Sequence, residues 1–257
     1  MTQQHDRPVQ RREALMDQAE KRASGWVLFG IPIQVDPGWF AIAGLMTWSL
    51  STGYFPERYP GFRDGVYWGM GVVATLLLFA CVLLHELGHS LAARHYGIPV
   101  LRVILFIFGG VAQIAGDARR PSVELKIALA GPVVSATISG LCFAISEALQ
   151  VHHPLQLVGV AILRYLAAIN AGILIFNLLP GFPLDGGRVL RAALWAWTRN
   201  LGWATRVVSV LGSVLGILLF VLGISFIVKG VWEGCWYVLL GFFLRQAAAN
   251  SGREPGV

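Results

Sequence analysis

The feature that most constrains this chain is an uncharged apolar run from Val66 to Leu84 that leads directly into His85-Glu86-Leu87-Gly88-His89. As a helix, the run is long enough to cross a hydrocarbon core of about 30 Å. Imidazole and carboxylate groups at the end of such a helix are costly to desolvate, and ionisable residues in membrane spans are functional candidates. The chain therefore joins a predicted membrane helix to a short cluster of chemically reactive side chains.

The spacing of the two histidines predicts a metal site. Residues at i and i+4 lie on one helix face with Cβ atoms roughly 5–6 Å apart, so both imidazoles reach one ion. Zinc binds imidazole nitrogen at about 2.0–2.1 Å. In an H-E-x-x-H pattern, Glu86 is predicted to act as a general base toward water. The alternative is a chance match, and the setting inside a membrane span argues against it.

Composition indicates an integral membrane protein. Only 13% of the 257 residues are charged and 56% are hydrophobic, whereas a soluble domain carries about 25% charged residues. The three cysteines fall in apolar runs and form no C-x-x-C pattern, which argues against a disulfide framework or a thiolate zinc site. The net charge of +6 comes from basic residues that border apolar segments. These residues indicate how the chain is oriented in the membrane rather than nucleic-acid binding.

The predicted fold class is an all-α polytopic membrane protein of about six transmembrane helices, with a small membrane-associated β-sheet or re-entrant hairpin. Two β-rich stretches, Trp26–Val35 and Val100–Ile114, are broken by glycine or proline and predict extended segments. The predicted spans are Pro37–Ser51, Val66 to about Tyr96, Lys126–Ser146, Leu155–Leu179, Val207–Val228 and Val231–Leu244.

Basic residues predict that both termini are cytoplasmic. With that orientation, sixteen Lys and Arg residues lie inside and only Arg58, Arg63 and Lys229 lie outside, as the positive-inside rule requires. The histidine motif then lies toward the cytoplasmic side. A polar stretch at 9–23 is compatible with a short surface helix, and the first 24 residues lack the apolar core of a signal peptide.

A third ligand is predicted at Asp185, in the stretch Asn177-Leu-Leu-Pro-Gly-Phe-Pro-Leu-Asp185-Gly-Gly-Arg188. A catalytic zinc site keeps three protein ligands and one open position. The prolines end the preceding span and let the chain fold back. The glycines allow the backbone to approach closely beside the predicted ligand. The alternative is that Asp185 caps the helix that follows, since aspartate is a good N-cap residue.

These motifs together resemble the site-2 protease family of intramembrane zinc metalloproteases. The resemblance rests on HELGH and NLLPGFPLDGGR, supported by LFGIPIQVDPGW, FGGVA and ALAGP, and covers about residues 25–195. It implies that the second and fourth helices are catalytic, that His85, His89 and Asp185 bind one zinc ion per chain, and that Glu86 activates water. Asn177 is similar to a family asparagine that assists the substrate or the tetrahedral intermediate.

The resemblance also implies the substrate and the domain plan. The expected partner is a single-span membrane protein in the lipid bilayer, such as an anti-sigma factor or a membrane-tethered transcription factor, usually after a prior cut. We expect a cytoplasmic polar segment at 1–24, a transmembrane metalloprotease domain at 25–249 and a cytoplasmic tail at 250–257. No PDZ or CBS domain is expected. The sequence does not predict the oligomeric state.

Several other polar residues have plainer interpretations. His152 and His153 are predicted to lie in an outer turn, and His95 at a helix end. Cys81 is expected to pack as a small apolar residue, with lining of a cavity as the alternative. Arg164 is predicted to snorkel or to pair with Glu147, or else to gate the substrate.

Two other functions remain as alternatives. A zinc transporter needs metal-binding polar residues at several depths, and the fifth span has no charged residue and no histidine. A catalytically silent scaffold is expected to lose the base or a ligand, and all four positions are intact.

Overall fold

The fold is described from a computed structural model of the chain, and the residues described are 26–251 apart from 108 and 117. The surface helix predicted at 9–23 lies outside the described residues, as do the polar segment at 1–24 and most of the tail at 250–257. The chain divides into two compact units. Unit 1 comprises Met1–Asp117 and Val134–Asn170, and unit 2 comprises Ala118–Val133 and Ala171–Val257.

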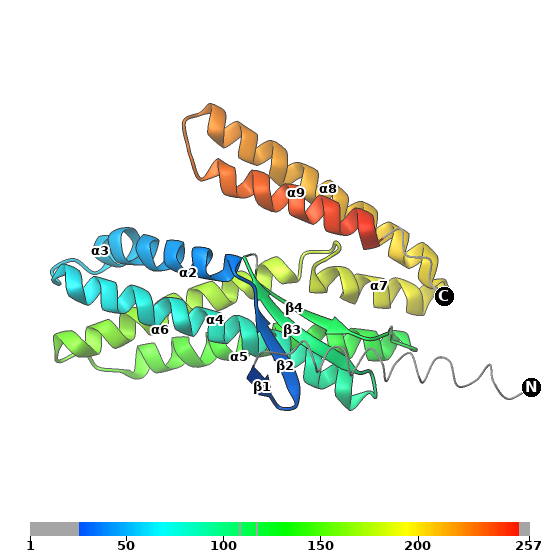
Figure 1. Cartoon of the computed structure of the whole chain (residues 1–257), viewed down its shortest axis with the longest axis horizontal. Coiled ribbons are helices and arrows are strands. Elements are labelled where there is room, and N and C mark those ends of the chain that lie inside the picture. Colours follow the sequence, from blue (N-terminus) through cyan, green and yellow to red (C-terminus); the bar gives the residue numbers. More distant parts are fainter. Residues whose placement is uncertain (1–25, 108, 117, 252–257) are drawn as a thin grey trace, which may run out of the picture. The chain divides into compact units, whose positions relative to one another are not determined.

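Helices make up most of the described chain (Figure 1). Their bounds are α2 Gly38–Ser49, η1 Leu50–Tyr54, α3 Phe55–Arg58, α4 Asp64–His95, α5 Pro121–Ala148, α6 Pro154–Asn177, α7 Asp185–Thr198, α8 Leu201–Val228 and α9 Gly234–Ser251. Four of these, α4, α5, α6 and α8, are long and apolar enough to cross a membrane. These four match the predicted second, third, fourth and fifth spans.

The predicted count of six spans is supported only for these four helices. The first predicted span contains α2, which has 12 residues and continues into the π-helix η1. The helical segment runs on through η1 into α3, and α2 is not among the four helices found long and apolar enough to cross a membrane. The sixth predicted span overlaps α9, which has 18 residues and is not among the four. The first and sixth spans therefore stay predictions.

Unit 1 contains a four-stranded mixed sheet in the order β1-β2-β3-β4. The strands are β1 Trp26–Leu28, β2 Ile31–Val35, β3 Val100–Phe106 and β4 Gly109–Ile114. Only β2 and β3 pair in parallel, and β3 and β4 form an antiparallel hairpin. Both β-rich stretches of the sequence thus form extended segments as predicted, and β4 lies at one edge of the sheet.

The sheet packs one face on α4. Leu87 of α4 lies in a buried cluster with Ile31 and Val103, against which Leu83 and Ala112 also pack. The side chain of Arg102 on β3 donates to Gln34 of β2 and Gln113 of β4, at 2.9 and 2.7 Å, and so ties three strands together. The strand hairpin is therefore fixed next to the helix that carries the histidines.

The main core of unit 1 lies where α4 meets the other helices of that unit. Met70, Ala74 and Cys81 of α4 are buried with Phe55 and Tyr165. On α4 the buried positions recur every three or four residues, which is the spacing of one helix face. His85 and His89 extend this same stripe toward the end of the helix, which explains how two polar side chains come to be buried.

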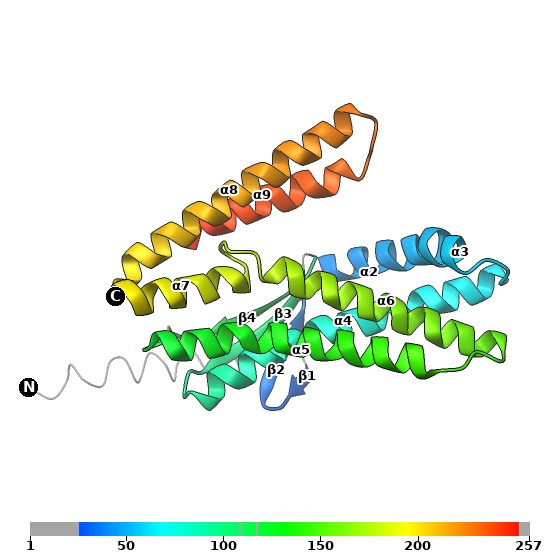
Figure 2. The same ribbon diagram turned by 180° about the vertical axis from the view of Figure 1, so that it is seen from behind.

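Unit 2 is built around the helix pair α8 and α9, which run side by side in both views (Figures 1 and 2). Glycines on each helix allow the close approach. A Cβ at Gly216 would lie 2.8 Å from the Gly241 carbonyl oxygen, and one at Gly223 would lie 2.6 Å from that of Gly234. Helix α7 also packs on α8. Unit 2 thus supports the loop and helix that carry Asp185.

Candidate metal centre

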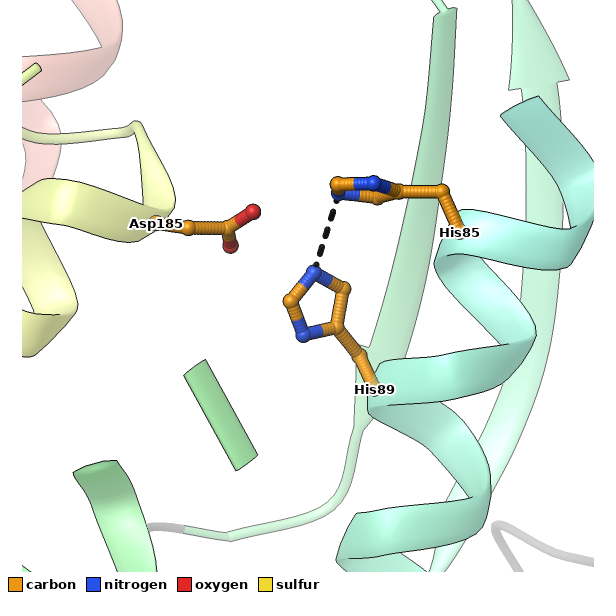
Figure 3. Close-up of side chains that lie close together, drawn as sticks. All are labelled: His85, His89 and Asp185. Carbon is orange, nitrogen blue, oxygen red and sulfur yellow. Dashed lines mark hydrogen bonds between the residues drawn. The ribbon is translucent and has the colours of Figure 1, made fainter. Parts of the chain in front are cut away.

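His85 and His89 face each other on the buried side of α4 (Figure 3). Their Nε2 atoms are 3.2 Å apart, and both residues are 4% exposed. Two nitrogens that bind one tetrahedral zinc ion at about 2.05 Å are separated by roughly 3.3 Å. The pair is therefore already close to the separation that a shared zinc ion needs.

Ser135 of α5 contacts the other nitrogen of His85. Its Oγ lies 2.8 Å from His85 Nδ1, and Ser135 is fully buried. If His85 Nδ1 carries the proton and donates to the hydroxyl, Nε2 keeps its lone pair for a metal. In that arrangement the hydroxyl accepts the hydrogen bond, and His85 is in the tautomer that a metal ligand requires.

Glu86 lies against the β4 strand. A Cβ built at Gly110 would lie 2.5 Å from Glu86 Cγ, so only glycine leaves room for the carboxylate side chain there. Glu86 itself is half-buried. The strand at the sheet edge and the predicted general base are therefore in direct contact within unit 1.

Asp185 is the first residue of α7 and is buried (Figure 3). The N-cap residue is Leu184, which makes no side-chain cap hydrogen bond, so the N-cap alternative for Asp185 is wrong. A carboxylate in the first turn is stabilised by the positive end of the helix dipole. His85, His89 and Asp185 make up a candidate metal-binding set of buried side chains among the described residues.

Glycines bring the loop before Asp185 into backbone contact with α7. A Cβ at Gly186 would lie 2.2 Å from the Leu178 carbonyl oxygen, and one at Gly187 would lie 2.6 Å from the carbonyl carbon of Gly181. The predicted close approach of Gly186 and Gly187 is therefore confirmed. Asn177, the other predicted residue of this stretch, is the last residue of α6 and is half-buried.

Three expectations for other polar residues are confirmed. Arg164 donates to Glu147 at 3.0 Å, with both side chains about half exposed. Cys81 is buried in the apolar core of unit 1. The backbone amides of His152 and His153 donate to the Gln156 side chain just before α6, which makes this exposed turn a helix cap.

Sequence reasoning missed two features, one beside His85 in unit 1 and one in unit 2. Ser135 follows the ALAGP stretch in an apolar span, and a hydroxyl in such a span is a signal that a polar partner lies opposite. Glu124 and Arg191 form a buried ion pair in unit 2, with Glu124 only 1% exposed. Glu124 precedes Lys126, the predicted start of the third span, so the sequence gives no signal that it is buried.

Comparison with known proteins identifies the family. The sequence profile of peptidase family M50 matches residues 73–160 and 150–222, which include both histidines, Glu86 and Asp185. The match covers more than half of the chain. The chain belongs to peptidase family M50. The resemblance of this M50 chain to the site-2 protease family is thereby confirmed.

Relatives and a solved structure agree with the M50 assignment. A Synechocystis protein named as a zinc metalloprotease is 40% identical over 90% of this chain and 59% of its own length. Rip3 of Mycobacterium tuberculosis, also named as a zinc metalloprotease, is 37% identical over 85% of this chain and 56% of its own. This M50 chain thus spans somewhat more than half the length of these relatives.

The solved structure is the site-2 protease from Methanocaldococcus jannaschii. It aligns with a TM-score of 0.57 at 25% identity, covering 90% of this M50 chain and 95% of that chain. The fold of the M50 chain is therefore that of a site-2 protease.

Proposed function

We propose that this chain is an intramembrane zinc metalloprotease that hydrolyses peptide bonds within or near transmembrane helices. The observation that carries the proposal is the 3.2 Å separation of the His85 and His89 Nε2 atoms, with Glu86 between them in sequence. Membership of peptidase family M50 supports it. In this proposal His85, His89 and Asp185 bind one zinc ion per chain.

Each residue has a stated role in the proposed reaction. Zinc in such a site supplies Lewis acidity, which polarises a carbonyl and lowers the pKa of water toward about 7. Glu86 takes a proton from the attacking water and later delivers it to the leaving amine. Ser135 holds His85 in the tautomer that leaves Nε2 available. Asn177 donates a hydrogen bond to the developing oxyanion or to the substrate backbone.

The substrate is held as an extended strand on β4. A transmembrane helix hides its peptide groups in internal hydrogen bonds, so it must unwind before attack. Strand β4 is an edge strand, Val111 on it is 44% exposed, and Gly110 touches the Glu86 side chain. A segment that pairs with this edge would pass beside the general base.

The proposed substrates are single-span, membrane-tethered regulatory proteins such as an anti-sigma factor or a transcription factor precursor. The distribution of basic residues supports a multi-pass protein in the cell membrane with both termini cytoplasmic. The active site would then open toward the cytoplasmic side, where a released regulatory domain acts.

The test is cleavage of a model single-span substrate in proteoliposomes, with metal content measured on the same samples. We expect Glu86→Gln to keep about one zinc ion and lose cleavage, because the amide cannot accept the water proton. Glu57→Gln, a matched change at an exposed position of α3, should behave as wild type. A scaffold would bind zinc and leave every substrate intact, and a transporter would move zinc into the vesicles.

A further inference from the structure

The helix that begins with Asp185 is held by a buried charge cluster away from the metal ligands. Arg191 of α7 donates through Nε to Glu124 Oε1 at 2.5 Å, and its Nη2 also contacts that oxygen. Glu124 lies in the first turn of α5 and is 1% exposed. A buried carboxylate is stable only with such a partner, so the pair fixes α7 to α5 within unit 2.

The same guanidinium also lies over the loop that precedes Asp185. Its central carbon is 5.0 Å from the centre of the Phe182 ring, which is within the range of a cation–π contact. Phe182 is buried beside Val208 of α8, and its backbone amide donates to the Val208 carbonyl at 3.3 Å. Arg191 thus contacts both α5 and the loop of the proposed third ligand.

Arg191 does not belong to the metal-binding set itself. Arg191 lies six positions after Asp185, which corresponds to a rotation of roughly 240° around the helix at 3.6 residues per turn. Asp185 and Arg191 therefore project from different sides of α7. One side carries the ligand, and the other holds the helix and its loop in place.

We propose that Arg191 is a positioning residue which, through Glu124 and Phe182, fixes the carboxylate of Asp185 for metal binding. The inference rests on the proposed function, because it takes Asp185 as a zinc ligand. Groups that orient metal ligands typically change metal affinity or activity by 10–100-fold when they are removed. Loss of the cluster should therefore weaken zinc binding through Asp185, while the positions of the two histidines stay unchanged.

The chain provides a matched control for this cluster. Arg164 and Glu147 form an ion pair of the same residue types at 3.0 Å, but both side chains are about half exposed. If removing the acidic partner of any arginine speeds zinc release, Glu147→Gln and Glu124→Gln should show the same increase. If zinc release speeds up because Asp185 is displaced, only Glu124→Gln should show the increase.

The experiment measures zinc release from the purified full chain to the chelating dye 4-(2-pyridylazo)resorcinol, well below the melting temperature of every variant. We expect Glu124→Gln and Arg191→Met to release zinc at least tenfold faster than wild type and Glu147→Gln. Arg191→Lys, which keeps the charge next to Glu124, should recover part of the loss. Cleavage assays should show a lower kcat with KM nearly unchanged, because the substrate strand contacts unit 1.

The outcomes separate this inference from the proposed function. If Asp185→Asn keeps zinc as wild type does, Asp185 is no ligand, and both the proposed metal site and the inference are overturned. If Asp185→Asn loses zinc while Glu124→Gln and Arg191→Met fold and release it at the wild-type rate, only the inference is overturned. A lower melting temperature with unchanged zinc release in the folded protein likewise assigns the cluster a purely structural role.

Discussion

The Nδ1 atom of His85 lies 2.8 Å from the hydroxyl oxygen of Ser135, and both residues are buried. The two residues are 50 positions apart, on α4 and α5. This contact occupies the nitrogen of His85 that faces away from His89, and it leaves the facing nitrogen for a metal. With the hydroxyl as acceptor, Nδ1 holds the proton and Nε2 is the nitrogen that can bind a metal.

Replacement of Ser135 by alanine should weaken zinc binding by about 10–100-fold, the usual effect of losing an orienting partner of a metal ligand. Metal content after dialysis against graded chelator concentrations measures this. Ser139→Ala is the control, since Ser139 lies one turn further along α5 and donates to the Ala167 carbonyl instead. Equal zinc affinity in the two variants would contradict a role for Ser135 in orienting His85.

Replacement of Gly110 by alanine should displace the Glu86 side chain, because the added Cβ would lie 2.5 Å from Glu86 Cγ. We expect cleavage to fall at least tenfold while zinc content stays at the wild-type level. The control is Gly140→Ala on α5, where an added Cβ meets nothing within 4 Å. A Gly110→Ala variant with full activity would show that Glu86 moves aside without cost and that the contact is unimportant.

The long apolar runs predict α4, α5, α6 and α8 because each run contains many consecutive apolar residues. The motif helix begins at Asp64 and ends at His95, within a few residues of the predicted bounds. The polar first turn of a helix has no apolar run to indicate where the helix begins. Helix α5 begins at Pro121 rather than Lys126, and the buried Glu124 lies in the turn that was missed.

Contacts between distant segments are harder to predict from one sequence. Both β-rich stretches are visible as strands, but nothing in either stretch indicates that β2 pairs with β3 in parallel. The candidate ligands are predictable because H-E-x-x-H is a local pattern. The partners Ser135 and Arg191 are not, since each depends on which helix lies opposite.

Proline in β4 should impair substrate cleavage without loss of zinc. Backbone amides of neighbouring strand residues point to opposite sides of the strand. Proline removes the amide hydrogen. One of the variants Val111→Pro and Ala112→Pro therefore loses an N–H that faces β3, and the other loses an N–H that faces the open edge. We expect the variant that keeps the β3–β4 hairpin to bind zinc normally and to cleave poorly. Val27→Pro, on the opposite edge strand β1, should cleave as wild type. Loss of zinc or of folding in both β4 variants would rule out this role for the edge.

Replacement of Gly212 by alanine should disturb the loop before Asp185 from the side of α8. An added Cβ would lie 2.0 Å from the Phe182 carbonyl oxygen and 2.8 Å from its amide nitrogen, and backbone atoms cannot move aside as a flexible side chain does. Overpacking of this kind costs about 1–3 kcal/mol. We therefore expect a lower melting temperature together with faster zinc release. Gly202→Ala, near the start of the same helix, meets only Asn200 Oδ1 at 3.7 Å and should leave both unchanged. If Gly212→Ala lowers the melting temperature but the folded protein retains zinc as wild type does, the loop tolerates displacement and α8 serves stability alone.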